Sequence, residues 1–299
     1  MRAGVTNTVN YATQFERQLV QKYTRELLTS EMTTEKVKFV NANTVKLPFI
    51  EMAGYKDHSR NGGFNRQSVK NDWQTFVLKH DRDVEFFVDK MDVDESNLTL
   101  AAANVTNEFE TQQDIPETDC YRISKLYAEM QTHSGTIDNT VPSAENILTL
   151  IDTGMKDMTE DGVPLEGRVL YVTPTVDQYL KDAKELQRYL NINGSNDGKV
   201  KRTIVDLDGV KIKPILSARM KTKYDFSDGC KPGVTAKQIN FILFHPKSIL
   251  ACDRHQYIKL WPEGTHTAGD GFLYQIRKYG DLFLIPNRKE GVYINAEAE

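Results

Sequence analysis

Cysteine and histidine are the side chains of this sequence whose spacing could support nucleophilic or metal chemistry. Cys252 stands three positions before His255, so an imidazole could activate a thiol, but no recognisable context supplies a third group to orient the pair. The histidines show neither the HExxH spacing of zinc hydrolases nor another metal-ligand spacing. We therefore expect no catalytic residue, no metal site and no cofactor. The histidines are His58, His80, His133, His245, His255 and His266.

Two further stretches resemble ligand-binding loops but lack the residues that such loops need. Residues 92–96 begin like an EF-hand calcium loop, yet Asn97 and Ala103 occupy the positions that require glycine and glutamate. Residues 194–199 are one position too short for a phosphate-binding P-loop, and no serine or threonine follows Lys199. We interpret residues 92–96 as a strand-to-helix turn, because acids favour a helix N-terminus. The sequence gives no indication of an enzyme.

Composition indicates an ordinary globular protein. The 299 residues are 39% hydrophobic, enough to bury a core in one or two domains, and no run reaches the ~20 apolar residues that cross a bilayer. The first residues are polar and lead into a charged helix, which predicts that there is no signal peptide. Cys120, Cys230 and Cys252 show no CxxC spacing, so we expect a reducing cytosol. The net charge of −4 predicts only weak contact with nucleic acid, because a tight binder carries a basic patch.

The chain is organised around the stretch from residue 92 to residue 131. Apolar residues at helical spacing predict one helix over about 97–113 and a second over about 116–131, with a hinge at 114–117. Pro116 fits the first position of a helix and not its interior, because it lacks an N–H and clashes one turn back. We expect the second helix to pack one face and leave the other free, as a strut ~25 Å long. Its apolar stripe is Cys120, Ile123, Leu126, Tyr127 and Met130.

Residues 37–91 predict an extended β-hairpin. One strand covers 37–52, with Val45, Leu47 and Phe49 on a shared face, and the other strand covers 73–91. The polar, glycine-containing residues 54–68 form the tip, and Pro48 favours an edge strand. Because a two-stranded hairpin is at best marginally stable in water, it must lie on its own domain or on a neighbouring copy. The pattern alone leaves both arrangements open.

The rest of the chain predicts a mixed α/β domain and several closing strands. An amphipathic helix is expected over about 12–29, packed on its own domain or acting as an arm that packs elsewhere. Further helices are expected from Ser143 and from Pro174, the second capped by Thr173. Strands are predicted at residues 167–174, 210–216, 239–245, 258–261, 272–286 and 292–295, with a helical turn at 246–250 and a surface loop at 191–202.

The order of these parts resembles the major capsid protein of tailed bacteriophages, of the kind found in phages of Gram-positive bacteria. Four segments carry the resemblance: residues 85–97, 114–126, 166–174 and 209–215. It covers about residues 30–295 and rests on the order and phrasing of the segments, not on a catalytic signature. The same fold family includes encapsulins and the floor of the herpesvirus capsid.

The resemblance implies an α+β fold with an N-terminal arm at 1–36 and an extended loop, the hairpin, at 37–93. A peripheral domain would take 94–134 and 256–299, with the helix from Pro116 as its long spine, and an axial domain would take 135–255. The charged residues of the hairpin tip are then candidate contacts between subunits. They are Lys56, Asp57, Arg60 and Arg66.

As a function, the resemblance implies a structural subunit that self-assembles as hexamers and pentamers into an icosahedral shell, the capsid of the virion, around double-stranded phage DNA. It implies assembly in the host bacterial cytoplasm, no membrane, and weak non-specific contact with the packaged DNA. A portal protein and head decoration proteins are expected partners. A separate scaffolding protein is also expected, because the N-terminal region is too short to contain a large scaffolding segment.

Two other functions fit the sequence. An encapsulin-like nanocompartment would use the same fold to enclose a cargo enzyme instead of DNA. A cytosolic binding module would capture a ligand with residues 54–68, and it predicts a monomer whose hairpin folds onto its own core. The position of the hairpin and the contents of any shell distinguish these alternatives.

Overall fold

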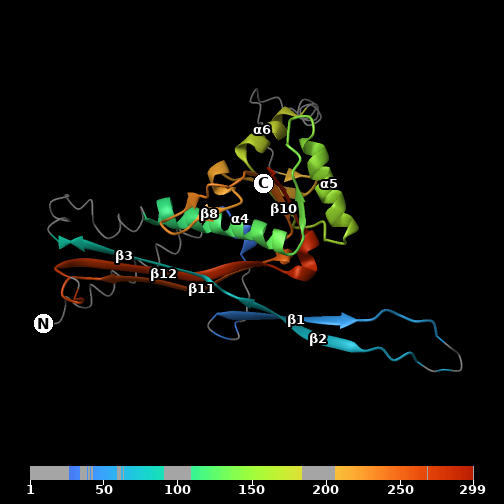
Figure 1. Cartoon of the computed structure of the whole chain (residues 1–299), viewed down its shortest axis with the longest axis horizontal. Coiled ribbons are helices and arrows are strands. Elements are labelled where there is room, and N and C mark those ends of the chain that lie inside the picture. The colour runs from blue at the N-terminus through green and yellow to red at the C-terminus, as the bar shows by residue number, and fades with distance from the viewer. Residues whose placement is uncertain are drawn as a thin grey trace, which may run out of the picture.

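The computed structural model of the chain describes residues 27–33, 39, 41, 43–58, 62, 64–90, 109–183, 206–267 and 269–298. Figure 1 shows a broad body, a long sheet with one helix lying along it, and a hairpin that extends beyond the body; the long sheet has three strands. The fold is α+β, as predicted.

The body is built on a six-stranded mixed sheet in the order β4-β13-β10-β5-β7-β6. β10 pairs antiparallel with β13 and β5, whereas β4 runs parallel to β13, and β5 runs parallel to β7. The strands predicted at 167–174, 210–216, 239–245 and 292–295 all lie in this sheet. Their bounds and those of the two edge strands are β4 Thr136–Asp138, β5 Val169–Val172, β6 Asp206–Leu207, β7 Val210–Pro214, β10 Ile239–Phe244 and β13 Val292–Ala296.

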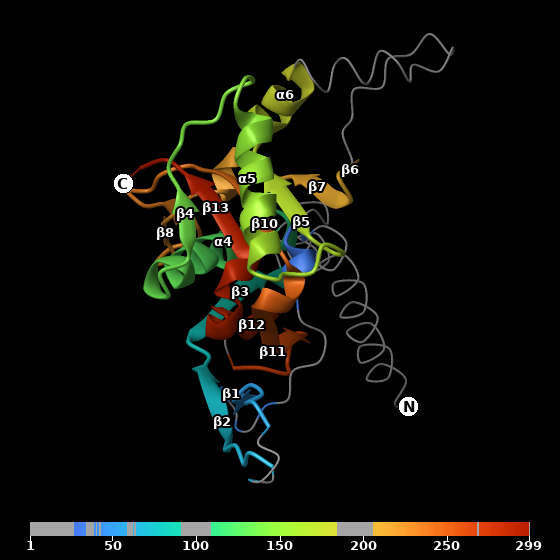
Figure 2. The same ribbon diagram turned by 90° about the vertical axis from the view of Figure 1, so that its right-hand side faces the viewer.

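Helices cover both faces of this sheet, so its central strands are apolar without alternation. α5 (Ile147–Glu160) and α6 (Pro174–Asp182) cover one face, and Figure 2 shows α5 lying against β13 and β10. In β5, Leu170 and Val172 pack with these helices, while Val169 and Tyr171 belong to the core on the opposite face.

Local polar contacts set the starts of these two helices. Thr173 caps α6 as predicted, because its hydroxyl accepts from the Val176 N–H at 3.4 Å. The helix predicted from Ser143 begins later, since the Asn146 side chain holds the preceding residues in a turn by accepting from the Ser143 N–H at 2.7 Å. The side chains of α5 that are buried, Ile147, Ile151 and Met158, belong to its predicted face.

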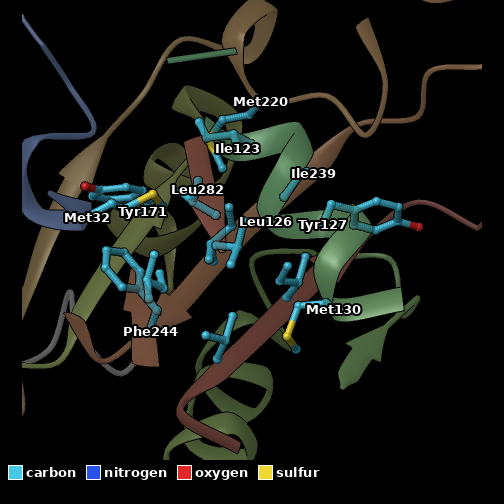
Figure 3. Close-up of a cluster of buried hydrophobic side chains, with 14 of the residues drawn as sticks. Met32, Ile123, Leu126, Tyr127, Met130, Tyr171, Met220, Ile239, Phe244 and Leu282 are labelled. Carbon is cyan, nitrogen blue, oxygen red and sulfur yellow. The ribbon is translucent and has the colours of Figure 1, made fainter. Parts of the chain in front are cut away.

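α4 (Ile115–Thr132) covers the other face of the six-stranded sheet and lies along the three-stranded sheet. Figure 3 shows Ile123, Leu126, Tyr127 and Met130 of its predicted stripe within the main core. The prediction that α4 leaves its opposite face free is wrong. Polar residues there are buried as well: Glu117, Thr118, Asp119, Arg122 and Ser124. All of them except Ser124 bond to other parts of the chain, whereas the Ser124 hydroxyl donates to the Cys120 carbonyl within α4.

The predicted hinge before α4 is also wrong. The backbone stays helical from Phe109 onward, and Glu110–Asp114 form a π-helical turn joined directly to α4. Pro116 is the second residue of α4 and has no N–H to donate, and the wider π turn before it accommodates the proline ring without interrupting the helix. Most of the helix predicted at 97–113 lies outside the described residues.

The long sheet is antiparallel in the order β11-β12-β3, with strands β3 His80–Asp89, β11 Ile249–Trp261 and β12 Gly271–Leu284. β11 starts much earlier than the predicted 258–261, because the helical turn expected at 246–250 is a short 3-10 turn that ends at Ser248. The first four residues of β11 are apolar and buried, but its middle lacks that signal, since Asp253, Arg254 and Gln256 are exposed at the edge of the sheet.

The predicted strand at 73–91 is two strands with different partners. β2 (Val69–Val77) pairs with β1 (Thr44–Met52), and β3 pairs with β12. The chain changes sheets at the buried Leu78, and the Lys79 N–H donates to Asp281 at 2.9 Å. The strand predicted at 37–52 begins at residue 44, because the chain reverses between Phe39 and Val45, which pair antiparallel.

Gly271 lies where β12 approaches β3 closely. A Cβ at Gly271 would overlap the Val88 carbonyl oxygen and lie 3.0 Å from Asp89 Cα. We expect Gly271→Ala to lower the free energy of unfolding by about 1–3 kcal/mol, measured by denaturant titration. Gly54→Ala is the matched control, because nothing lies within 4 Å of its Cβ position. Equal losses in the two variants would contradict this β3–β12 contact.

Candidate assembly surface

The β1–β2 hairpin has a hydrophobic root. The Phe76 ring of β2 packs against the Phe283 ring of β12 at a centroid separation of 5.2 Å. Figure 1 shows that the rest of the hairpin extends beyond the body. The root therefore fixes the hairpin to the end of the long sheet. Its buried residues are Val45, Leu78, Leu250, Cys252 and Phe283.

The two faces of the hairpin differ in how their polar and apolar residues are distributed. Residues that pair across two antiparallel strands lie on the same face, so the pairing assigns each residue to one of the two faces. One face contains the pairs Val45/Phe76, Leu47/Gln74, Phe49/Asp72 and Glu51/Lys70. It is apolar at the root and becomes polar towards the tip. The other face contains the pairs Lys46/Thr75, Pro48/Trp73, Ile50/Asn71 and Met52/Val69. It becomes more apolar towards the tip.

We name five residues of this second face, Pro48, Ile50, Met52, Val69 and Trp73, the hairpin apolar face. Four of them are more than half exposed: Ile50 at 61%, Met52 at 73%, Val69 at 63% and Trp73 at 53%. Scattered exposed apolar residues are normal on a protein surface, but a contiguous group on one projecting strand pair indicates a surface that another molecule covers.

The hairpin tip carries the charged residues predicted to contact other subunits. Lys56, Asp57 and Arg66 are exposed, and Arg60 lies outside the described residues. The Asn65 side-chain amide donates to the Asp57 carbonyl at 2.9 Å, which links the two sides of the tip. The structure brings three of the predicted residues to one end of the molecule, and their pairing with a neighbour stays a prediction.

Sequence reasoning missed the hairpin apolar face. The signal was present: residues 47–50 are apolar at four successive positions, so both parities of the strand are apolar. The predicted pattern places Val45, Leu47 and Phe49 on a shared face and says nothing of the alternate positions. The alternate residues Pro48, Ile50 and Met52 continue the apolar pattern onto the opposite face of the hairpin.

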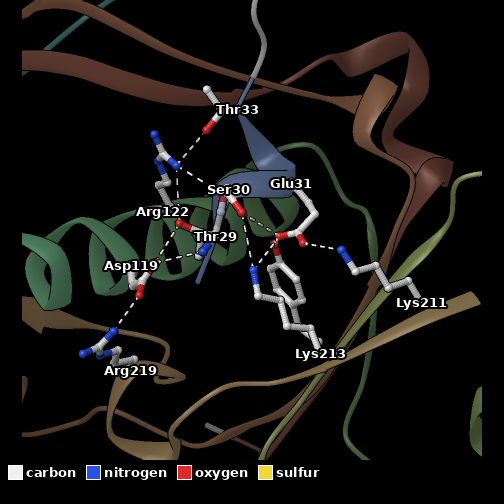
Figure 4. A network of polar contacts seen from close by, with 10 residues as sticks. Thr29, Ser30, Glu31, Thr33, Asp119, Arg122, Lys211, Lys213 and Arg219 are labelled. Carbon is white, nitrogen blue, oxygen red and sulfur yellow. Dashed lines mark hydrogen bonds and ion pairs between the residues drawn. The ribbon is translucent and has the colours of Figure 1, made fainter. Parts of the chain in front are cut away.

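A polar network fixes residues 29–33 to the body (Figure 4). Asp119 of α4 is fully buried and accepts from the Thr29 N–H at 3.0 Å, from the Thr29 hydroxyl at 2.8 Å and from Arg219 at 2.8 Å. Arg122, also buried, donates to the Thr29 carbonyl at 3.2 Å and to the Thr33 hydroxyl at 3.0 Å. We name these five residues the N-terminal clamp.

Glu31 extends these contacts to β7 and β5. Lys213 and Lys211 donate to its two carboxylate oxygens at 2.8 and 3.0 Å, and the Tyr171 hydroxyl donates at 3.0 Å. Burial raises the pKa of Glu31, but the hydrogen bonds from Lys213 and Lys211 outweigh it and hold the pKa at about 2, below the ordinary 4.5. The charged form is therefore favoured in the folded protein.

The depressed pKa of Glu31 predicts a pH-dependent contribution to stability. A carboxylate whose pKa falls on folding stabilises the protein fully above its ordinary value of 4.5, and this contribution disappears as the pH falls through about 2. We expect Glu31→Gln to lower the free energy of unfolding at pH 7 by about 1–3 kcal/mol. Urea titrations at stepped pH values should show the two proteins converging between pH 4.5 and 2, and a constant difference would contradict the assignment.

The described residues give no support to Cys252 as a nucleophile. Burial raises the pKa of the Cys252 thiol to about 12, so the thiol stays protonated, and the His255 side chain lies outside the described part. Within the described ranges, no group of three or more histidine, cysteine, aspartate or glutamate side chains is placed to hold a metal ion. None of the described helices is both long enough and apolar enough to span a membrane.

Comparison with known proteins links this geometry to solved structures. No protein-family model matches the sequence, and no curated protein matches it. The structure from Mycobacterium phage Che8 is 17% identical, with a TM-score of 0.63 over 88% of this chain and 92% of that one. The mature capsid of bacteriophage PhiM1 is 13% identical, with a TM-score of 0.67 over 90% and 86%. The virus-like particle from Pyrococcus furiosus is 13% identical, with a TM-score of 0.52 over 95% and 99%.

These likenesses extend over most of each chain and establish the fold. The chain has the α+β fold of tailed-phage major capsid proteins, as the order of its segments predicted. An archaeal virus-like particle shares this fold.

Proposed function

We propose that the chain is the major capsid protein of a tailed bacteriophage and that its copies assemble into the shell of the virion. Hexamers and pentamers would form an icosahedral capsid around double-stranded DNA. The hairpin apolar face carries the proposal, because it lies on a projection with a fixed root and has no cover within the described part of the subunit. The fold shared with phage capsids supports the same conclusion.

A neighbouring copy is the occupant that best fits this face. A two-stranded hairpin has open edges and is marginal alone in water, so a contact with another subunit would stabilise it and cover its apolar side chains. Each such contact can be modest, because many simultaneous contacts hold each subunit in a shell. The charged tip residues Lys56, Asp57, Arg60 and Arg66 would lie at the far end of the same contact.

The remaining partners follow from this function. The chain is slightly acidic, with a net charge of −4, which suits a container whose DNA must be packed and later released, because a basic wall would retain it. Contact with the DNA would be weak and non-specific. A scaffolding protein, a portal protein and decoration proteins would join the particle, which would be assembled in the cytoplasm of the host bacterium.

The proposed division of the subunit has an N-terminal arm at 1–36, an extended loop at 37–93, a peripheral domain at 94–134 and 256–299, and an axial domain at 135–255. Two structural features cross this division. β11 runs through the boundary at residues 255 and 256, and β13 lies in the six-stranded sheet of the body although its sequence belongs to the peripheral segment. The two domains would therefore share strands at their junction.

An encapsulin-like nanocompartment is the second candidate function. It is considered because the fold also occurs in a virus-like particle, that of Pyrococcus furiosus, whose match covers 95% of this chain and 99% of that one. The shell contacts would be the same and the contents would differ. The binding-module alternative expected the hairpin to fold on its own core, whereas Figure 1 shows the hairpin extending beyond the body.

Size-exclusion chromatography with negative-stain microscopy tests the proposal. The protein is expressed alone and together with the genes that neighbour it in its source genome. We expect closed shells, capsomer rings or sheets. Nucleic acid extracted from shells made during infection should be double-stranded DNA, whereas a cargo enzyme and no DNA would favour the nanocompartment. A monomer in every condition would overturn the proposal.

The tip can be tested separately by removing residues 54–68. We expect the deletion variant to fold and to assemble poorly, because the root is retained while the charged tip is lost. Circular dichroism and thermal unfolding check the subunit, and the fraction of protein that sediments as shells checks assembly. Shells in normal yield from the deletion variant would show that the tip makes no necessary contact.

A further inference from the structure

A groove lies between the hairpin and the body at the hairpin root. Its volume is about 730 Å³, and residues of β1 and β2 line it together with residues near the start of β11 and the end of β12. We name it the root groove. Both the hairpin and the body contribute apolar side chains to it. They include Leu47, Phe49, Ile249, Leu250 and Ile285.

Two cations belong to the lining of the root groove. Lys247 and Arg288 are both exposed, and the Arg288 guanidinium donates to the Lys247 carbonyl at 3.0 Å, which holds it beside that residue. The described lining contains no aspartate or glutamate, and no ion pair between described residues engages either cation. A surface that combines apolar side chains with unpaired cations fits a partner that carries apolar side chains beside carboxylates.

The loop that follows α5 has the complementary character. Glu160, Asp161 and Glu166 are exposed, and no ion pair in the described part of the chain engages them. Leu165 lies among these acids and is 61% exposed. We name residues 160–166 the α5 loop. It presents an apolar side chain flanked by carboxylates.

A buried arginine holds the α5 loop in shape. Arg168 is 1% exposed, and its guanidinium donates to the Val163 carbonyl at 2.7 Å and to the Pro164 carbonyl at 2.9 Å. It also donates to the Thr159 hydroxyl at 3.1 Å, so the loop is tied to the last turn of α5. Because the loop is already fixed in the folded subunit, little conformational entropy is lost when it binds a partner.

The α5 loop of a subunit does not line the root groove of that same subunit, so a second copy must supply it. We propose that the α5 loop of one copy binds in the root groove of the next. Leu165 would lie against the apolar side chains, and Asp161 and Glu166 would lie beside Lys247 and Arg288. The loop and the groove are different surfaces, so the contact is heterologous, and a series of such contacts builds a ring when the rotation closes.

This contact rests on the proposed function, because it names one of the contacts that would join copies within a capsomer. The two can nevertheless fail separately. A wild-type chain that stays monomeric in every condition would overturn the proposed function and the contact together. Shells from the wild type, with variants of the loop or groove that assemble equally well, would overturn the contact alone.

Charge reversal tests the contact in the full-length chain. The groove variant carries Lys247→Glu and Arg288→Glu, and the loop variant carries Asp161→Lys and Glu166→Lys. Each variant places like charges on the two sides of the contact, so we expect the yield of shells, measured by sedimentation, to fall at least ~10-fold. Circular dichroism and thermal unfolding should match the wild type, because all four side chains are exposed.

Combining the substitutions should restore the attraction. A chain with all four has an acidic groove and a basic loop, and we expect it to assemble at close to wild-type yield. Co-expression of the groove variant with the loop variant should also produce rings, because alternating copies pair opposite charges at every contact. Only a ring with an even number of copies can alternate in this way. Native mass spectrometry should therefore find mixed rings with even and not with odd numbers of copies.

A matched control reverses two exposed acids elsewhere on the surface. Asp83→Lys together with Glu145→Lys makes the same change in net charge as the loop variant, and we expect this chain to assemble normally. A loss of shells as large as that of the loop variant would reveal an effect of net charge and overturn the proposal. If the groove and loop variants fail and neither the combined chain nor the mixture recovers, the root groove binds a different partner, which overturns it as well.

Discussion

Replacing Ile50 and Trp73 together by serine leaves the subunit folded and prevents it from forming closed shells. The two side chains are 61% and 53% exposed, so the isolated subunit loses little buried apolar area. In a shell, each would transfer from water into a contact, and full burial of a large apolar side chain is worth about 1.5–3 kcal/mol. Because the loss recurs at every subunit, we expect the yield of shells to fall by at least ~10-fold.

The matched control lies on the same strands and the opposite face. Glu51 and Lys70 face each other on β1 and β2, both are exposed, and we expect the double serine variant at these positions to assemble normally. Thermal unfolding confirms that each variant is folded, and analytical ultracentrifugation measures the shell fraction. Shells at wild-type yield from the Ile50 and Trp73 variant would remove the hairpin apolar face from the assembly contact.

Asp119→Ala lowers the free energy of unfolding by about 3–5 kcal/mol, the loss expected when a buried ion pair is broken by removing one partner. The carboxylate is fully buried and accepts two hydrogen bonds from Thr29 and one from Arg219. Its removal leaves the Thr29 N–H and the Arg219 guanidinium without their acceptor. Denaturant titration gives the loss, and proteolysis should show earlier cleavage near residue 29.

An exposed ion pair provides the comparison for this variant. Asp228 and Lys231 pair at 2.8 Å, but their side chains are 90% and 66% exposed. We expect Asp228→Ala to leave the unfolding transition unchanged, because water replaces the lost contact. If Asp119→Ala behaves in the same way, the N-terminal clamp does not hold residues 29–33 to the body.

The elements that sequence reasoning predicted correctly are those with local causes. The run Ile239–Phe244 is apolar at five of six positions, and such a strand must be buried on both faces. Thr173 followed by Pro174 supplies a cap and a first helical residue within two positions. The order of segments also led to the tailed-phage capsid fold, which the solved structures of phage capsids confirm.

The elements that sequence reasoning missed depend on partners far away in the chain. The change from β2 to β3 at Leu78 is fixed by the contact from Lys79 to Asp281, 202 positions later. Asp119 and Arg122 belong to residue types that usually face water on a helix, yet they are buried here because Thr29 and Arg219 supply their partners.

The candidate site was predictable in position and not in chemistry. The hairpin and its tip were located from strand patterns and glycine content, and Lys56, Asp57 and Arg66 are exposed there. The exposed apolar side chains were not identified, because a strand with apolar residues at both parities is normally buried on both faces. Ile50 and Trp73 depart from that rule because the described subunit places nothing over them.

β13 lies between β4 and β10 inside the six-stranded sheet, although its residues are translated after every other strand of that sheet. Until the residues of β13 leave the ribosome, no strand lies between β4 and β10, and the main core lacks Val292 and Ile294. The native sheet therefore waits for contacts of long sequence separation, which slows folding. The body of the subunit, from which the hairpin extends, cannot fold completely before residue 296 has been translated. Assembly of one subunit with another can therefore begin only after that point.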